Sequence, residues 1–117
     1  MNLVYICHPF DGTPEEIRAN IRSARRYARY VAGINGWFPV CTHTMWERVI
    51  SAKSNKTRDE IMSSCLHILT KCNLIAVCGV RVTDGMNMEI FKAYTNNLCR
   101  VNLEHPHKTK NVFIRDV

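Results

Sequence analysis

Residues 74–90, LIAVCGVRVTDGMNMEI, decide how this chain of 117 residues folds. The segment begins with the apolar run LIAVC, which is typical of a central strand in a parallel sheet. A polar loop follows over residues 80–85. A helix is then predicted from about Met86 to Asn97, with Asp84 as its N-cap. A buried strand that leads through a polar loop into a helix is the repeating unit of α/β folds.

The same unit stands near the start of the sequence. Leu3–Cys7 is a short apolar run that predicts another strand. Thr13, Pro14 and Glu16 have the spacing of an N-cap, a first helical residue and a capping box. Gly33–Gly36 end the predicted helix. Its apolar stripe follows helical spacing and consists of Ile17, Ile21, Ala24, Ala28 and Val31.

Shorter segments complete the alternation of strands and helices. Trp37–Cys41 is predicted to be a strand, Met45–Ile50 a helical turn and Ser51–Lys56 a loop. Thr57 and Glu60 have the spacing of a second capping box. The next helix face consists of Ile61, Cys65, Ile68, Leu69 and Cys72. The candidate edge strands are Arg100–Leu103 and Val112–Ile114.

This alternation predicts one α/β domain over residues 1–117. Right-handed crossovers bring alternating strands into a parallel sheet that is covered by helices on both faces. We expect a flavodoxin-like (Rossmann-like) sheet of four or five strands, in which Leu3–Cys7 and Leu74–Cys78 are central and parallel. In such sheets a ligand binds outside the carboxyl ends of the strands.

Composition limits the class of protein. Hydrophobic residues make up 46% and charged residues 22% of the chain, close to the globular average, which argues against long disorder. No apolar run approaches the roughly 18 residues of a membrane span. The first ten residues lack the basic start and cleavage site of a secretory signal, so we expect a cytoplasmic protein. The six cysteines include no C-x-x-C pair and are expected to be buried, reduced thiols.

The net charge of +6 favours an anionic partner without identifying it. The helix after Pro14 carries five arginines, with Glu15 and Glu16 nearby, which favours a solvated face over a nucleic-acid surface. The segments Cys41-Thr42-His43 and His105-Pro106-His107 lack the partner pair of a structural zinc site. We therefore expect no metal and no cofactor.

Polar residues follow each of the three clear strands, and these loops should meet at one edge of the sheet. The helix amides that follow them favour an anion, so a phosphate-binding edge is predicted. Glu89 lies about one turn, or roughly 5–6 Å, beyond the first amides of its helix, about the span of a sugar ring. The helix N-terminus should help to keep this carboxylate ionised. The expected ligand-binding residues are His8, Pro9, Phe10, Gly12, His43, Thr83, Gly85, Met86 and Asn87.

Three segments resemble the nucleoside 2-deoxyribosyltransferase superfamily. They are VYICHPFDG (residues 4–12), Thr42-His43, and TDGMNMEIFKA (residues 83–93). The resemblance extends over residues 2–103 and is nearest to small bacterial and phage members. The chain is also similar to the 2′-deoxynucleoside 5′-monophosphate N-glycosidases. The resemblance implies that the protein lies in the cytoplasm of bacteria or of phage-infected cells. It also implies a homodimer or larger homo-oligomer, in which a neighbouring subunit closes each site.

The resemblance also implies roles for individual residues. Glu89 matches the family's nucleophile and Tyr5 the tyrosine that orients it. Thr83 matches a phosphate-binding serine, and His43 a histidine near the base or phosphate. The family's enzymes usually carry an aspartate in the helix before the third strand, where this chain has Ser64 or Cys65. Asp84 and His43 are therefore the candidates for the acid that protonates the leaving base.

The expected reaction is cleavage or transfer at the N-glycosidic bond of a nucleoside or nucleoside 5′-monophosphate, through a glycosyl-enzyme on Glu89. The alternative is a nucleotide-binding protein of the same fold that senses or sequesters its ligand without turnover. A third class is a basic DNA- or RNA-binding accessory protein, which is less expected because the arginine-bearing helix favours a solvated face.

Overall fold

The computed structural model describes residues 1–44, 57–106 and 112–116. The predicted turn Met45–Ile50 and loop Ser51–Lys56 lie outside these residues. The strands are β1 (Asn2–Cys7), β2 (Trp37–Val40), β3 (Leu74–Cys78), β4 (Cys99–Leu103) and β5 (Val112–Asp116). The helices are α1 (Pro14–Ala32), α3 (Arg58–Leu69) and α4 (Asp84–Thr95).

The strands form one sheet in the order β2-β1-β3-β4-β5, which is the flavodoxin-like order that the sequence predicts. β1, β2, β3 and β4 are parallel, and β1 and β3 are central, as predicted. β5 is an exception to the predicted parallel sheet, because it pairs antiparallel with β4. Residues 104–111, which join these two strands, are fewer than a parallel crossover needs. The chain therefore turns back at the edge of the sheet.

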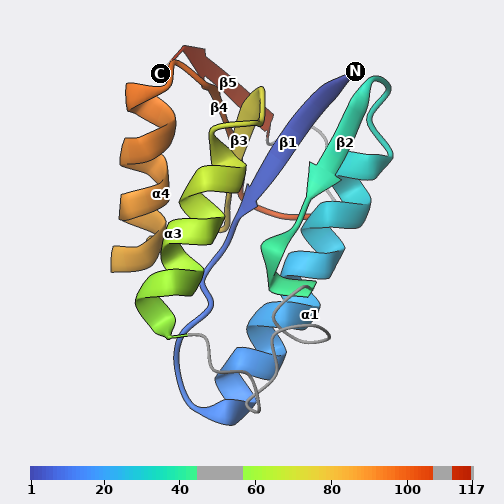
Figure 1. Ribbon diagram of the computed structural model, residues 1–117. Helices are drawn as coiled ribbons and strands as arrows, with labels where there is room; N and C mark the ends of the chain where they lie inside the picture. Colours follow the sequence, from blue (N-terminus) through green and yellow to red (C-terminus); the bar gives the residue numbers. More distant parts are fainter. Residues whose placement is uncertain (45–56, 107–111, 117) are drawn as a thin grey trace.

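Helices cover both faces of the sheet (Figure 1). α1 packs on one face, where Tyr27 and Val31 meet Val4 and Ile6 of β1. α3 and α4 pack on the other face, where their residues meet Tyr5 and other side chains of β1 and β3. β1 serves both layers because alternate side chains of a strand point to opposite faces.

A threonine caps the N-terminus of each of α1, α3 and α4. Thr13 forms the predicted capping box with Glu16, and the Thr57 hydroxyl accepts a hydrogen bond from the Glu60 N–H at 3.1 Å. At α4, however, the N-cap is Thr83 and not Asp84. Thr83 has the extended backbone that a cap requires, and its hydroxyl accepts from the Met86 N–H at 3.3 Å. Asp84 instead begins the helix, where its charge complements the helix dipole.

The cysteines form no disulfide, as predicted. Four of them are buried, whereas Cys41 and Cys99 are only partly buried, so the expectation of six buried thiols holds for four. Cys72, which the apolar spacing predicts to lie on a helix face, lies just beyond the end of α3. It still packs in the core formed with α3 and α4. Within the described part of the chain, no helix is long and apolar enough to span a membrane.

Candidate functional site

A pocket lies at the carboxyl edge of the parallel strands. The centres of water-sized molecules have about 60 Å³ within it, and the total free space is about 520 Å³ when the open solvent at its mouth is included. The loops after β1 and β2, the start of α4 and one side of α3 line it, as the predicted gathering of loops requires. The lining residues are His8, Phe10, Asp11, Thr42, His43, Ile61, Met62, Cys65, Thr83, Gly85, Met86 and Glu89. This is the Glu89 pocket.

Glu89 is a buried carboxylate that accepts hydrogen bonds from two side chains of β1. The Tyr5 hydroxyl donates a short hydrogen bond to Oε2 of Glu89. The Cys7 thiol donates to Oε1 at 3.5 Å. The Tyr5 hydroxyl also lies 3.4 Å from Oγ1 of Thr42. Tyr5 and Cys7 reach one carboxylate because they are two residues apart and share a face of the strand. The predicted pairing of Tyr5 with Glu89 is therefore present.

Burial sets the ionisation of this group. Loss of solvent raises the pKa of Glu89 from 4.5 to about 7, although the hydrogen bonds from Tyr5 and Cys7 act in the opposite direction. The helix N-terminus is expected to help keep Glu89 ionised. Burial instead outweighs the hydrogen bonds from Tyr5 and Cys7, so that the pKa of the carboxyl lies in the neutral range. Burial also raises the pKa of the Tyr5 hydroxyl, which therefore stays a donor.

Two histidines form the wall opposite α3. His8 Nδ1 donates to the Pro9 carbonyl at 2.8 Å, and His8 Nε2 accepts from the Ser23 hydroxyl at 2.8 Å. His43 Nε2 donates to the same carbonyl at 3.2 Å. Burial, and then the field of His8, lower the pKa of His43 to about 4. Its Nδ1 is consequently a bare acceptor, with no hydrogen-bond partner among the described residues. Aromatic contacts with Phe10 and His8, at centroid distances of 5.4 and 5.6 Å, fix the ring.

Most of the predicted ligand-binding residues line the Glu89 pocket, but five of the predicted site residues do not. Tyr5 is one of these, and it binds Glu89 from β1. Pro9 is buried beside the pocket and supports both histidines through its carbonyl. Gly12 has φ +143°, and a Cβ there would lie 2.8 Å from Cβ of Glu16, so it serves the turn into α1. Asn87 is exposed. Asp84, a candidate acid, is exposed and lines an adjoining cavity with Asp59.

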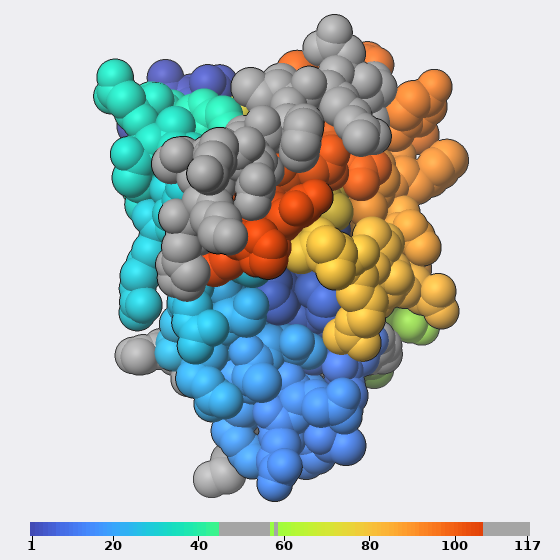
Figure 2. Space-filling model, turned by 180° about the vertical axis from the view of Figure 1, so that it is seen from behind, coloured from blue at the N-terminus to red at the C-terminus, as the bar shows by residue number. Residues whose placement is uncertain are grey.

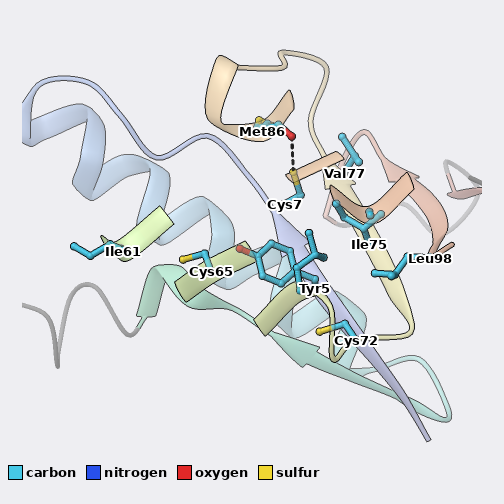
Figure 3. Packing of buried hydrophobic residues seen from close by; sticks show 11 residues of the cluster. Tyr5, Cys7, Ile61, Cys65, Cys72, Ile75, Val77, Met86 and Leu98 are labelled. Atoms are coloured by element: carbon cyan, nitrogen blue, oxygen red, sulfur yellow. Dashed lines mark hydrogen bonds between the residues drawn. The ribbon is translucent and has the colours of Figure 1, made fainter. Parts of the chain in front are cut away.

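Several lining residues were not predicted. Asp11 belongs to the loop that the sequence singled out, yet its carboxylate was overlooked in favour of Asp84. Ile61, Met62 and Cys65 come from α3, whose apolar stripe was interpreted only as core. Cys7 was likewise assigned to the core. Figure 3 shows the Tyr5 hydroxyl pointing toward Cys65, in the part of α3 where the resembling family usually carries its aspartate.

Among the residues that the structure describes, no group of three or more His, Cys, Asp or Glu could hold a metal ion. The chain finds no match among curated proteins. A family model does match residues 2–102, which include every element from β1 through most of β4. The chain therefore belongs to the family described as a domain of unknown function (DUF7768).

Proposed function

We propose that the protein cleaves or transfers at the N-glycosidic bond of a nucleoside or nucleoside 5′-monophosphate, with Glu89 as the nucleophile. The observation that carries this proposal is a buried carboxylate in a pocket, with each oxygen held by a donor from β1. Two donors orient the carboxylate, and exclusion of water leaves its ionised form poorly solvated and therefore nucleophilic. The resemblance of residues 83–93 to the deoxyribosyltransferase superfamily points to the same residue.

In the reaction, a carboxylate oxygen of Glu89 forms a bond to C1′ of the sugar while the C1′–N bond breaks. The electron pair of that bond leaves with the base, which takes up one proton. Water then attacks C1′ and restores the carboxylate, so that the products are the free sugar and the free base. If a second base attacks C1′ in place of water, the enzyme is a transferase.

The departing base needs a proton donor within the pocket. His43 lines the pocket, but it is neutral above about pH 4 and its one N–H is bonded to Pro9. Asp84 faces the adjoining cavity. Asp11 is therefore the better placed acid, because it lines the Glu89 pocket as well as the adjoining cavity. Replacement by Asn should slow base release while leaving ligand affinity within about three-fold.

A non-catalytic nucleotide-binding protein is the second candidate. The observation that favours it is Cys65, which lines the pocket on α3 where the resembling enzymes usually carry an acid. A binding protein would use the same walls and the same carboxylate, but it would release no base.

We also propose that the protein forms a homo-oligomer, as the resemblance implies. Exposed apolar side chains gather on the loop before α4 and on α4 itself. Such a surface suits a second copy of the chain.

The experiment is a panel of deoxynucleosides and their 5′-monophosphates, assayed chromatographically for free base. Glu89→Gln should lower turnover by several orders of magnitude and leave ligand affinity within about ten-fold, because the amide keeps the volume but loses the nucleophile. Glu15→Gln, at an exposed position on α1, is the matched control and should react like the wild type. Wild-type base release from Glu89→Gln contradicts the mechanism. Binding without base release by the wild type supports the second candidate.

A further inference from the structure

Cys7 is the second donor to Glu89, and the steps of the proposed reaction do not explain what its weak bond contributes. It is the last residue of β1 and is completely buried. Its thiol lies 3.5 Å from Oε1 of Glu89 and 3.9 Å from the Met86 carbonyl oxygen, and Figure 3 shows it turned toward Met86. A thiol has one proton, so it can donate to only one of these oxygens at a time.

The two carboxylate oxygens of Glu89 are held unequally. The Tyr5 phenol is a strong donor and binds Oε2, whereas the thiol is a weak donor and binds Oε1. Oε1 therefore keeps more of the negative charge. The thiol can turn to the Met86 carbonyl when Oε1 no longer accepts, so that no buried donor is left without a partner.

We propose that Cys7 is a positioning residue for Glu89, which orients Oε1 and stabilises the ionised carboxylate through a bond weak enough to be exchanged. This inference rests on Glu89 being the reactive carboxylate of the proposed function. Burial raises the pKa of the Cys7 thiol well above its usual value, and the nearby Glu89 raises it further. The sulfur is therefore protonated at neutral pH and acts as a donor, not as a competing nucleophile.

The test compares Cys7→Ala with Cys7→Ser, since serine keeps a donor and alanine does not. The carboxyl pKa of Glu89 is measured by carbon NMR in protein labelled at glutamate, and the Glu89→Gln spectrum identifies the signal. Cys7→Ala should raise the midpoint by about half a pH unit or more, and Cys7→Ser should return it to the wild-type value or below. Cys72→Ala removes another buried thiol from the same core without touching Glu89, and should leave the midpoint unchanged.

The midpoint is measured without turnover, so this inference and the proposed function can fail separately. If base is released, the acidic limb of the kcat/KM profile should shift in the same order across the variants. An unchanged midpoint in Cys7→Ala overturns the inference even if the protein is an enzyme. Equal midpoints in the alanine and serine variants also overturn it, because they would show that only the volume of the side chain matters.

Discussion

Burial moves the ionisation of Glu89 and His43 in opposite senses. The apolar surroundings disfavour the charged form of each, which raises the pKa of the acid to about 7 and lowers that of the base to about 4. Near pH 7 the His43 ring is neutral, and the Glu89 carboxyl group is present in both its protonated and its ionised form. Each residue therefore makes the stability of the fold depend on pH over its own range.

Glu89→Gln should become more stable relative to the wild type as the pH rises. Between pH 4.5 and 7 the folded protein holds a proton on Glu89 that the unfolded chain has released, so wild-type stability falls with rising pH. Glutamine does not titrate, so the stability of the variant lacks this dependence on pH. The free energy of unfolding of the variant, relative to wild type, should gain roughly 3 kcal/mol between pH 4.5 and pH 8. Urea unfolding at the two pH values measures it, and a constant difference would show that Glu89 titrates normally.

His43→Gln tests the opposite sign. The unfolded chain protonates His43 near pH 6.5 and the folded protein only near pH 4, so this residue lowers wild-type stability as the pH falls through that range. The variant lacks this loss and should gain roughly 3 kcal/mol relative to wild type from pH 7 to pH 4. His67→Gln, at an exposed position on α3, is the control. Parallel stability curves for wild type and His43→Gln would contradict a buried neutral imidazole.

At the scale of elements, the local signals in the sequence were sufficient for most of the fold. The Thr13 capping box and the runs at β1 and β3 identify their elements without tertiary information, because caps and apolar periodicity are properties of short segments. The N-cap of α4 was misplaced by one residue because Thr83 and Asp84 are both good caps. The direction of β5 depends on the length of the connection before it, which a propensity argument ignores.

The candidate site was only partly predictable for a related reason. Glu89, Tyr5 and the three loops follow from the edge rule for parallel sheets and from the resemblance. Cys7 and the α3 residues are apolar in sequence context, and the same stripe that packs a core can also line a pocket. Only the packing of α3 against α4 shows which of its residues face the cavity.

Thr83→Ala separates the cap from the predicted phosphate contact. Loss of the cap should destabilise the protein by about 1 kcal/mol. Because a hydrogen bond to phosphate is worth roughly 1.5–3 kcal/mol, the variant should also bind a deoxynucleoside monophosphate about ten-fold more weakly, and the nucleoside much less so. Thr57→Ala removes the equivalent cap of α3, away from the pocket, and should change stability alone. Equal losses of affinity for the nucleoside and the monophosphate would show that Thr83 does not bind phosphate. Repulsion of the phosphate by Asp59 and Asp84 in the adjoining cavity would favour that result.

At the scale of the whole molecule, one surface differs from the rest. Large apolar side chains are exposed on the loop after β3 and along α4, which Figure 2 shows in yellow and orange. They are Val80, Val82, Met88, Phe91 and Tyr94. Met88, Phe91 and Tyr94 recur at a spacing of three, so they form one stripe of the helix. Exposed apolar side chains that share one face of a helix mark an association site more often than a solvated one.

The proposed homo-oligomer therefore predicts that Phe91→Glu yields a monomer. Phe91 is 67% exposed and lies at the middle of the α4 stripe. The free energy needed to bury an unpaired carboxylate between two copies would exceed the free energy that the contact contributes. Phe38→Glu is a matched control, because Phe38 is 57% exposed on β2 at the opposite edge of the sheet. Light scattering at micromolar concentration should give an oligomer for the wild type and for Phe38→Glu, and a monomer of 13.5 kDa for Phe91→Glu. A monomeric wild type would rule out the oligomer, and loss of association in Phe38→Glu alone would move the interface to β2.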